Sequence, residues 1–154
     1  KTMGYYDEIS EGYNELHSGE QLKKLGVIFD KFDIRKDKVL DVGCGTAFYF
    51  GFFEDYTGVD NSLGMIEKSD ANVIFGEAEK LLFKDDSFDT VISLSAIHNF
   101  DDPKKAVDEM KRVSRGKIII TVFKRAKNFK EIENLLKDFD RTEEDKDVIF
   151  YSVS

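Results

Sequence analysis

The chain has 154 residues, a length typical of one domain, and 41% of them are hydrophobic, which is enough to fill a core. Its formal net charge of −8 excludes a surface that holds a nucleic-acid backbone without a partner, because phosphate binding needs a basic footprint. The single cysteine excludes an intrachain disulfide and favours a reducing, cytoplasmic location, and no apolar run is long enough to cross a membrane.

Segments with strand and helix periodicity alternate along the chain. Strands are predicted at residues 38–42, 56–60, 72–75, 88–94 and 117–123. Helices are predicted at residues 20–32, 46–53, 62–69, 103–114 and 129–139. The strands are short and apolar, as strands buried on both faces are, and the longer helices each carry one apolar stripe. This alternation is typical of α/β proteins.

Three of the predicted helices have recognisable start signals. Either Asn61 or Ser62 is placed to cap the helix that follows it. Asp102 comes directly before a proline, which is a favoured first residue of a helix. Asn128 is followed three residues later by Glu131, and this spacing predicts a capping box.

The chain ends in a predicted hairpin, formed by residues 139–142 and 148–153. We therefore expect one domain over residues 1–154, in which an N-terminal helical lid segment (1–35) precedes a Rossmann-like core (36–154). The expected core is an α/β fold: a doubly wound, mostly parallel seven-stranded sheet with one antiparallel strand and helices on both faces.

Glycines and acids follow the predicted strands at the positions where such a sheet binds its ligand. Gly43 and Gly45 come directly after the first strand, where they allow a tight turn and a close approach of the backbone to a ligand. The second strand ends in Asp60, which is placed to bind ribose hydroxyls, and Glu77 follows the third strand. Their order along the chain favours a nucleotide-like ligand over an ordinary turn.

The residues around the two glycines distinguish between two such ligands. A dinucleotide site needs a third glycine, and Phe48 occupies that position. Asp41, just before the turn, would repel a pyrophosphate but suits the cationic amino-acid end of S-adenosylmethionine. The pattern therefore favours S-adenosylmethionine.

The segment from residue 38 to residue 123 resembles class I S-adenosylmethionine-dependent methyltransferases, in particular the ubiquinone/menaquinone-biosynthesis-type branch. The resemblance is carried by "VLDVGCGTA", "GVDNS" and "GEAEKLLFKDDSFDTVISLSAIHNFDDPKKAVDEMKRV", in that order. It implies an enzyme that uses S-adenosylmethionine and releases S-adenosylhomocysteine.

The resemblance also implies a role for each residue that matches the family motifs. The residues expected at the methionine end are Asp41, Gly43, Cys44 and Gly45, those at the ribose are Asp60 and Asn61, and those at the adenine are Glu77 and Ala78. Ser93, Leu94 and Ser95 are expected to line the cofactor and substrate pocket. Cys44 has no base or second thiol in its motif, so we interpret it as a small packing residue there. No Cys/His cluster suggests a metal.

The substrate side of the expected site is less typical of the family. "LSAIHNF" stands where many members have Asn-Pro-Pro-Tyr, which disfavours methylation of an amide or exocyclic base nitrogen. His98 lies where the substrate would arrive and is either a general base or a wall of the pocket. Tyr5 and Tyr13 resemble a lid segment that folds over the cofactor, although they could equally pack on the sheet.

Three functions remain open. The first is methyl transfer to a small-molecule acceptor. The second is methylation of RNA or protein with a partner, because the chain is close to a bare core and its aromatic run at residues 48–53 exceeds what one helix face can bury. The partner would be a small activator subunit or, less specifically, a second copy in a homodimer. The third is a non-catalytic module that binds S-adenosylmethionine.

Overall fold

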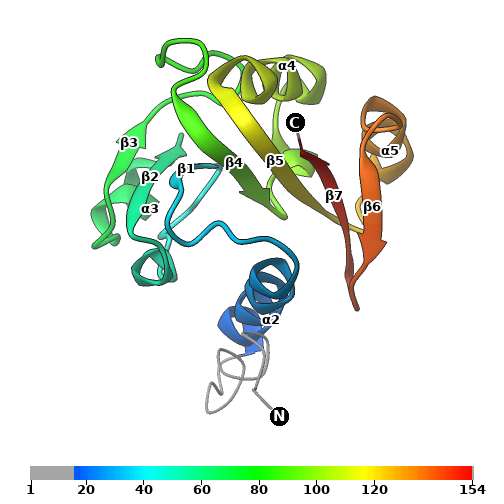
Figure 1. The fold of residues 1–154 in the computed structure, drawn as a ribbon, viewed down its shortest axis with the longest axis horizontal. Coiled ribbons are helices and arrows are strands. Elements are labelled where there is room, and N and C mark those ends of the chain that lie inside the picture. Colours follow the sequence, from blue (N-terminus) through cyan, green and yellow to red (C-terminus); the bar gives the residue numbers. More distant parts are fainter. Residues whose placement is uncertain (1–15, 154) are drawn as a thin grey trace.

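The computed structural model describes residues 16–153 (Figure 1). The strands are β1 (Lys38–Val42), β2 (Asp55–Asp60), β3 (Val73–Phe75), β4 (Phe88–Leu94), β5 (Ser114–Phe123), β6 (Asp140–Glu143) and β7 (Asp147–Val153). The α-helices are α2 (Leu16–Lys31), α3 (Leu63–Glu67), α4 (Pro103–Val113) and α5 (Phe129–Leu135), and η1 (Phe50–Phe52) and η2 (Ile97–Asn99) are single 3₁₀ turns. None of the helices within residues 16–153 combines the length and the apolar character that a bilayer crossing needs.

The strands form one seven-stranded sheet in the order β3-β2-β1-β4-β5-β7-β6. All the pairs from β3 to β5 are parallel, and only β7 runs antiparallel to its two neighbours, β5 and β6. The predicted sheet, with one antiparallel strand, is therefore confirmed. The chain leaves β1 toward β2 on one side and returns to β4 on the other, so the topological switch point lies at β1.

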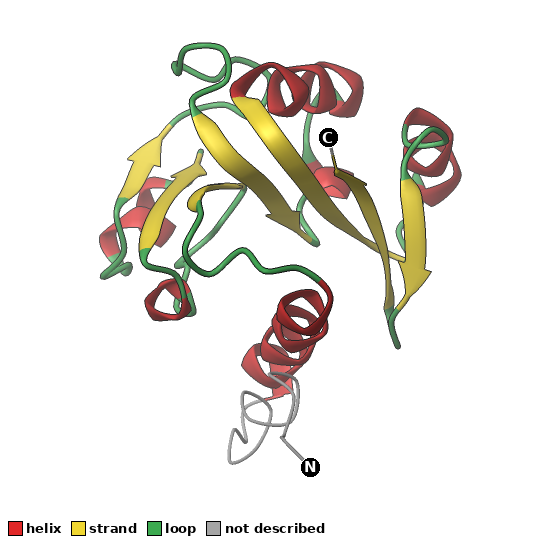
Figure 2. Cartoon of the chain, viewed as in Figure 1, coloured by secondary structure: helices red, strands yellow, loops and turns green. Residues whose placement is uncertain are grey.

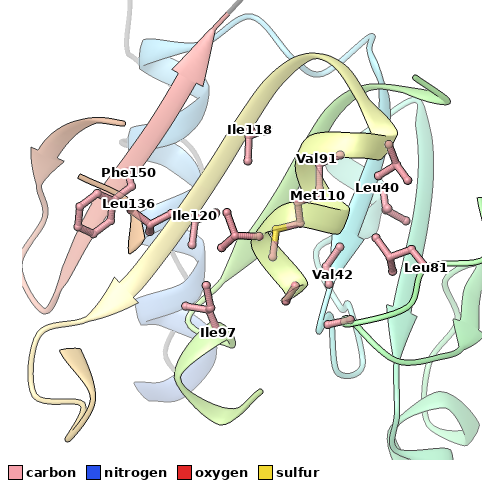
Figure 3. Packing of buried hydrophobic residues seen from close by; sticks show 14 of the residues in the cluster. Leu40, Val42, Leu81, Val91, Ile97, Met110, Ile118, Ile120, Leu136 and Phe150 are labelled. Atoms are coloured by element: carbon pink, nitrogen blue, oxygen red, sulfur yellow. The ribbon is translucent and has the colours of Figure 1, made fainter. Parts of the chain in front are cut away.

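Helices pack on both faces of this sheet, which forms the middle of the molecule in Figure 2. Side chains alternate between the faces along each strand, as a period of two requires. On β5, Ile118 and Ile120 belong to the cluster under α4 and α5, shown in Figure 3, whereas Ile119 belongs to the cluster under α2. Both faces of the sheet are therefore buried, which explains why the central strands are rich in apolar residues.

The start signals of two helices behave as the sequence predicts. Asp102 caps α4 by accepting a hydrogen bond from the backbone N–H of Lys105, and Pro103 takes the first helical position. Ser62 caps α3 by accepting one from the backbone N–H of Met65. In α4 the positions Ala106, Val107, Met110 and Val113 are buried, which gives the helix the apolar stripe that its spacing indicates.

The predicted helix at residues 46–53 is wrong, because this segment forms turns and the single 3₁₀ turn η1. Ala47 adopts a left-handed conformation with φ of 51°, which an α-helix cannot contain. The irregular path lets Tyr49 and Phe53 both reach the core under α2, where the ring of Phe53 packs edge-on against Phe29. Most of the aromatic run is therefore packing, and only Phe48, at 37%, is exposed.

The capping box predicted at the start of α5 is also wrong. The Asn128 side chain makes no cap hydrogen bond, and its Nδ2 donates instead to the backbone oxygen of His98, at 3.2 Å. A contact between two loops has replaced a local contact, and it ties the start of α5 to the turn η2 that carries His98.

Candidate active site

A cavity of about 750 Å³ opens at the carboxyl ends of the parallel strands, next to the switch point. Of the residues expected in the site, those that line this cavity are Gly43, Cys44, Gly45, Asp60, Asn61, Glu77, Ala78, Leu94, Ser95 and His98. They come from the carboxyl ends of β2 and β4 and from the loops after β1, β2, β3 and β4. The fold thus brings together residues that are distant in the sequence, because the ends of parallel strands meet at one edge of the sheet.

The glycine turn is held in place by Asp60. The backbone N–H of Gly45 donates to one oxygen of its carboxylate, at 2.7 Å, and the backbone N–H of Ser62 donates to the other, at 2.9 Å. The backbone N–H of Gly43 donates to the carbonyl of Val59, at 2.8 Å. Each carboxylate oxygen of Asp60 can accept a second hydrogen bond, so the side chain can shape the turn and still bind a ligand.

Cys44 fills the space beside a glycine of the neighbouring strand. A Cβ added to Gly58 would lie 2.5 Å from its sulfur, so the thiol packs closely against β2. Burial raises the pKa of the thiol, and the charges of Asp41 and Asp60 raise it further. The thiol is therefore protonated and unreactive at neutral pH, as expected of a packing residue.

Asp41 and Ser93 do not line the cavity. Asp41 is fully buried on the α2 face of β1, where its Oδ2 accepts hydrogen bonds from the hydroxyls of Tyr49 and Tyr56, each at 2.6 Å. Its Oδ1 has no partner among the described residues. Ser93 Oγ donates to the carbonyl of Val42, at 2.8 Å, and so supports the strand that leads into the turn.

Burial raises the pKa of Asp41 from its ordinary value of 3.8 to about 6, although the two tyrosine hydroxyls oppose this shift. The folded protein therefore binds a proton there more tightly than the unfolded chain. This shift contributes about 3 kcal/mol to the free energy of unfolding. The contribution is fully present below pH 4 and is lost as the pH rises through 6.

Replacing Asp41 with asparagine should therefore stabilise the ligand-free protein at pH 7.5, by about 1–3 kcal/mol, because a neutral oxygen can still accept from both tyrosines. At pH 4 the two proteins should unfold at nearly the same urea concentration. Urea titrations of both proteins at both pH values measure this. A difference in unfolding free energy between the two proteins that is the same at pH 4 and pH 7.5 would contradict it.

His98 lies partly buried in the wall of the cavity, on η2. Its Nδ1 is enclosed and has no hydrogen-bond partner among the described residues, and its ring centre lies 6.4 Å from that of Phe123. Burial is the main cause that lowers the pKa of His98, and Lys24 lowers it further, whereas Asp147 raises it. The imidazole is therefore neutral at pH 7, the form in which it can accept a proton.

A polar cluster on the same wall has no signal in the sequence pattern. Lys24 of α2 and Asp147 of β7 form an ion pair, with Nζ 3.1 Å from Oδ2, and Ser95 is hydrogen-bonded to both. Lys24 lies outside the apolar stripe of its helix, where a lysine normally faces solvent. Tyr5 and Tyr13, the expected lid residues, lie outside the described residues.

Acidic side chains dominate the cavity wall. Among the described residues, the acids in the lining are Glu20, Asp60, Glu77, Glu79, Asp101 and Asp147, and the only lysines are Lys24 and Lys146. The basic residues Lys124, Arg125, Lys127 and Lys130 do not line it. No group of three or more metal-binding side chains occurs within residues 16–153. The cavity is thus built for a cationic or neutral ligand.

The chain is similar in sequence to known proteins. The family model described as "Methyltransferase domain" matches residues 40–122. A demethylmenaquinone methyltransferase of Renibacterium salmoninarum is 37% identical over 139 residues, which cover 80% of this chain and 59% of the relative. This chain spans about six tenths of the length of the curated relatives it matches.

Two solved structures share the fold at lower identity. The PH0226 protein of Pyrococcus horikoshii has a TM-score of 0.74 at 23% identity, and the match covers 99% of both chains. A putative methyltransferase of Haloferax volcanii, solved in complex with the Trm112 methyltransferase activator, has a TM-score of 0.63 at 16% identity, over 77% of this chain and 82% of that one. Because the family model covers more than half of the chain, this protein belongs to the methyltransferase domain family, and within it to the class I S-adenosylmethionine-dependent methyltransferase family.

Proposed function

We propose that this chain transfers a methyl group from S-adenosylmethionine to a small-molecule acceptor. The observation that carries the proposal is the cavity at the switch point, into which the glycine turn, Asp60 and His98 all face. One end of it has the glycines and acids of the family's cofactor site. Residues of α2, Ser95 and His98 also line the cavity, and we assign this part of it to the acceptor.

The cofactor end fits S-adenosylmethionine in shape and charge. A Cβ added to Gly45 would meet nothing within 4 Å, so the backbone of the turn borders open space. Asp60 and Asn61 would hold the ribose, Glu77 and Ala78 the adenine, and the glycine turn the methionine end. S-adenosylmethionine supplies a methyl group already activated on a positive sulfonium, which an acidic wall favours.

Because the methyl group is already activated, the protein mainly has to align the acceptor and exclude water. His98 is the residue placed to accept a proton when the acceptor arrives protonated. Changing His98 to alanine should leave the affinity for S-adenosylhomocysteine within about twofold and lower methyl transfer by about 10²–10⁴-fold.

Isothermal calorimetry and initial rates would separate these two effects of the His98 substitution. A variant that loses affinity as much as rate would place His98 in cofactor binding and contradict the proposed role. A variant that keeps its full rate would leave His98 as a wall residue only.

Calorimetry with S-adenosylhomocysteine is also the first test of the function. Incubation with methyl-tritiated S-adenosylmethionine and cell fractions would then show whether label enters small molecules, RNA or protein. Label in the small-molecule fraction supports the proposal. Binding without transfer to any fraction would support the non-catalytic module instead.

A second candidate, action with a partner subunit, is favoured by the outer edge of the sheet. Within residues 16–153, β3 pairs only with β2, and its Ile74 and Phe75 are 44% and 53% exposed. Leu63 and Met65 of α3 extend this apolar surface, at 63% and 44%. An unpaired edge with apolar side chains is a typical protein-binding feature.

Changing Phe75 to glutamate distinguishes the two candidates. Small-molecule methylation by the isolated chain should not change, because Phe75 does not line the cavity. The partner-dependent function would be supported by a different result: label is transferred only when a cell extract is added, and Phe75→Glu abolishes this transfer.

A further inference from the structure

A largely buried polar cluster, built on the pair Lys24 and Asp147, lies in the wall of the cavity. The ammonium of Lys24 donates to Asp147 Oδ2 and to Ser95 Oγ, and Ser95 Oγ donates in turn to Asp147. The hydroxyl of Thr121 lies 3.3 Å from Ser95 Oγ and accepts from the Ser95 backbone N–H, at 2.8 Å. The cluster joins α2, the loop after β4, β5 and β7, and three of its members line the cavity.

Stability alone does not explain this cluster. Lys24 and Asp147 are only 6% and 2% exposed, and burying such a pair gains little or nothing over two apolar side chains of similar volume. Ser95 also holds a left-handed backbone conformation, with φ of 51°, which costs energy in any residue but glycine. Buried charge and backbone strain at one point of a cavity wall indicate a binding role.

The hydrogen bonds of Lys24 leave one donor for a ligand. An ammonium group has three N–H bonds, and two of them are used within the described residues, by Ser95 and Asp147. Because Lys24 lines the cavity, the third is available to a molecule bound there. Its partner must be an acceptor atom, and oxygen is the common one in small molecules.

The charges of the cavity select the kind of oxygen. Asp147 neutralises Lys24, and acids outnumber lysines on the wall, so a carboxylate or phosphate would be repelled. A carbonyl or hydroxyl oxygen would not. The rings of His98 and Phe123, 6.4 Å apart, provide flat apolar surface beside the cluster.

We propose that Lys24, held by Asp147 and Ser95, is an acceptor-binding residue that donates to an uncharged carbonyl or hydroxyl oxygen on a ring-bearing methyl acceptor. This inference rests on the proposed function, since it places the acceptor beside the cofactor. It assigns the acceptor end of the cavity to neutral molecules and excludes anionic ones.

The first test uses three ring probes of similar size: phenol, benzoate and benzylamine. Each is titrated into the wild-type protein saturated with S-adenosylhomocysteine, and its affinity is measured by ligand-observed NMR. Phenol should bind best. Preferential binding of benzoate or of benzylamine, or binding of none of the three, would overturn the proposal without any variant being needed.

The second test removes the pair without leaving a buried charge. In Lys24→Met combined with Asp147→Leu, both groups become apolar, and a thermal melt checks that the protein is folded. Phenol affinity should fall by about tenfold, the effect of losing one charged hydrogen bond, while S-adenosylhomocysteine affinity stays within about twofold.

Unchanged phenol affinity in the double variant would show that the pair is only structural and overturn the proposal. A wild-type protein that does not bind S-adenosylhomocysteine would instead contradict the proposed function. The two failures are therefore distinguishable.

Discussion

Replacing Asp60 with alanine is expected to weaken S-adenosylhomocysteine binding by at least about 100-fold. Two losses combine in this variant. The ribose hydroxyls lose a charged acceptor, and such hydrogen bonds contribute about 1.5–3 kcal/mol each. The backbone N–H groups of Gly45 and Ser62 also lose their shared partner, so the turn that faces the ligand is no longer held.

Calorimetry of Asp60→Ala beside His98→Ala measures this, because both side chains line the same cavity and only one is assigned to the cofactor. Asp60→Asn is the matched control, since asparagine keeps one oxygen acceptor and should lose less affinity than alanine does. Urea unfolding of each variant measures its stability, and a loss of stability would indicate that the turn itself is disturbed. A loss of affinity without a loss of stability would indicate a lost contact with the ligand. Equal losses of affinity in Asp60→Ala and His98→Ala would contradict the assignment of Asp60 to the ribose.

The fold could be predicted because local and global signals agree in this sequence. Six of the seven residues of β4 and the stretch 118–122 of β5 are buried, and only an interior strand buries both faces. α4 has its cap, its proline and its apolar stripe in the expected places. The hairpin at the end of the chain supplies β7, the single antiparallel strand. Each of these features depends on residues that are close in sequence.

The predicted helix at residues 46–53 failed for the opposite reason. Local sequence favours no regular structure there, because five of the eight residues are aromatic and lose side-chain freedom in a helix. Packing decides the outcome, and the positions of Phe29 and Tyr56, on other elements, determine which rings are buried. A pattern read along one segment contains no information about those neighbours.

The site shows the same division. The glycines and acids at strand ends could be found by sequence, because the topology alone brings strand ends together. The direction of Asp41 could not, since both faces of β1 are buried and the apolar pattern does not tell them apart. The pairing of Lys24 with Asp147 joins residues 123 positions apart, so only the assembled fold reveals it.

Gly43 and Gly45 form a matched pair for the last prediction. Both hold left-handed conformations, with φ of 77° and 59°, so alanine at either position costs about 1–2 kcal/mol in backbone strain. At Gly43 a Cβ would also lie 2.8 Å from Ala96 Cβ and 3.0 Å from the ring of Phe100. At Gly45 it would meet no protein atom within 4 Å.

Gly43→Ala should therefore lower the free energy of unfolding by about 2–4 kcal/mol, because overpacking adds to the strain. Gly45→Ala should lower it by no more than about 2 kcal/mol, yet it should lose most of its affinity for S-adenosylhomocysteine, since its new methyl group would occupy the cavity. Urea unfolding and calorimetry on both variants give the comparison. A Gly45→Ala protein that binds S-adenosylhomocysteine normally would show that the ligand does not approach this turn.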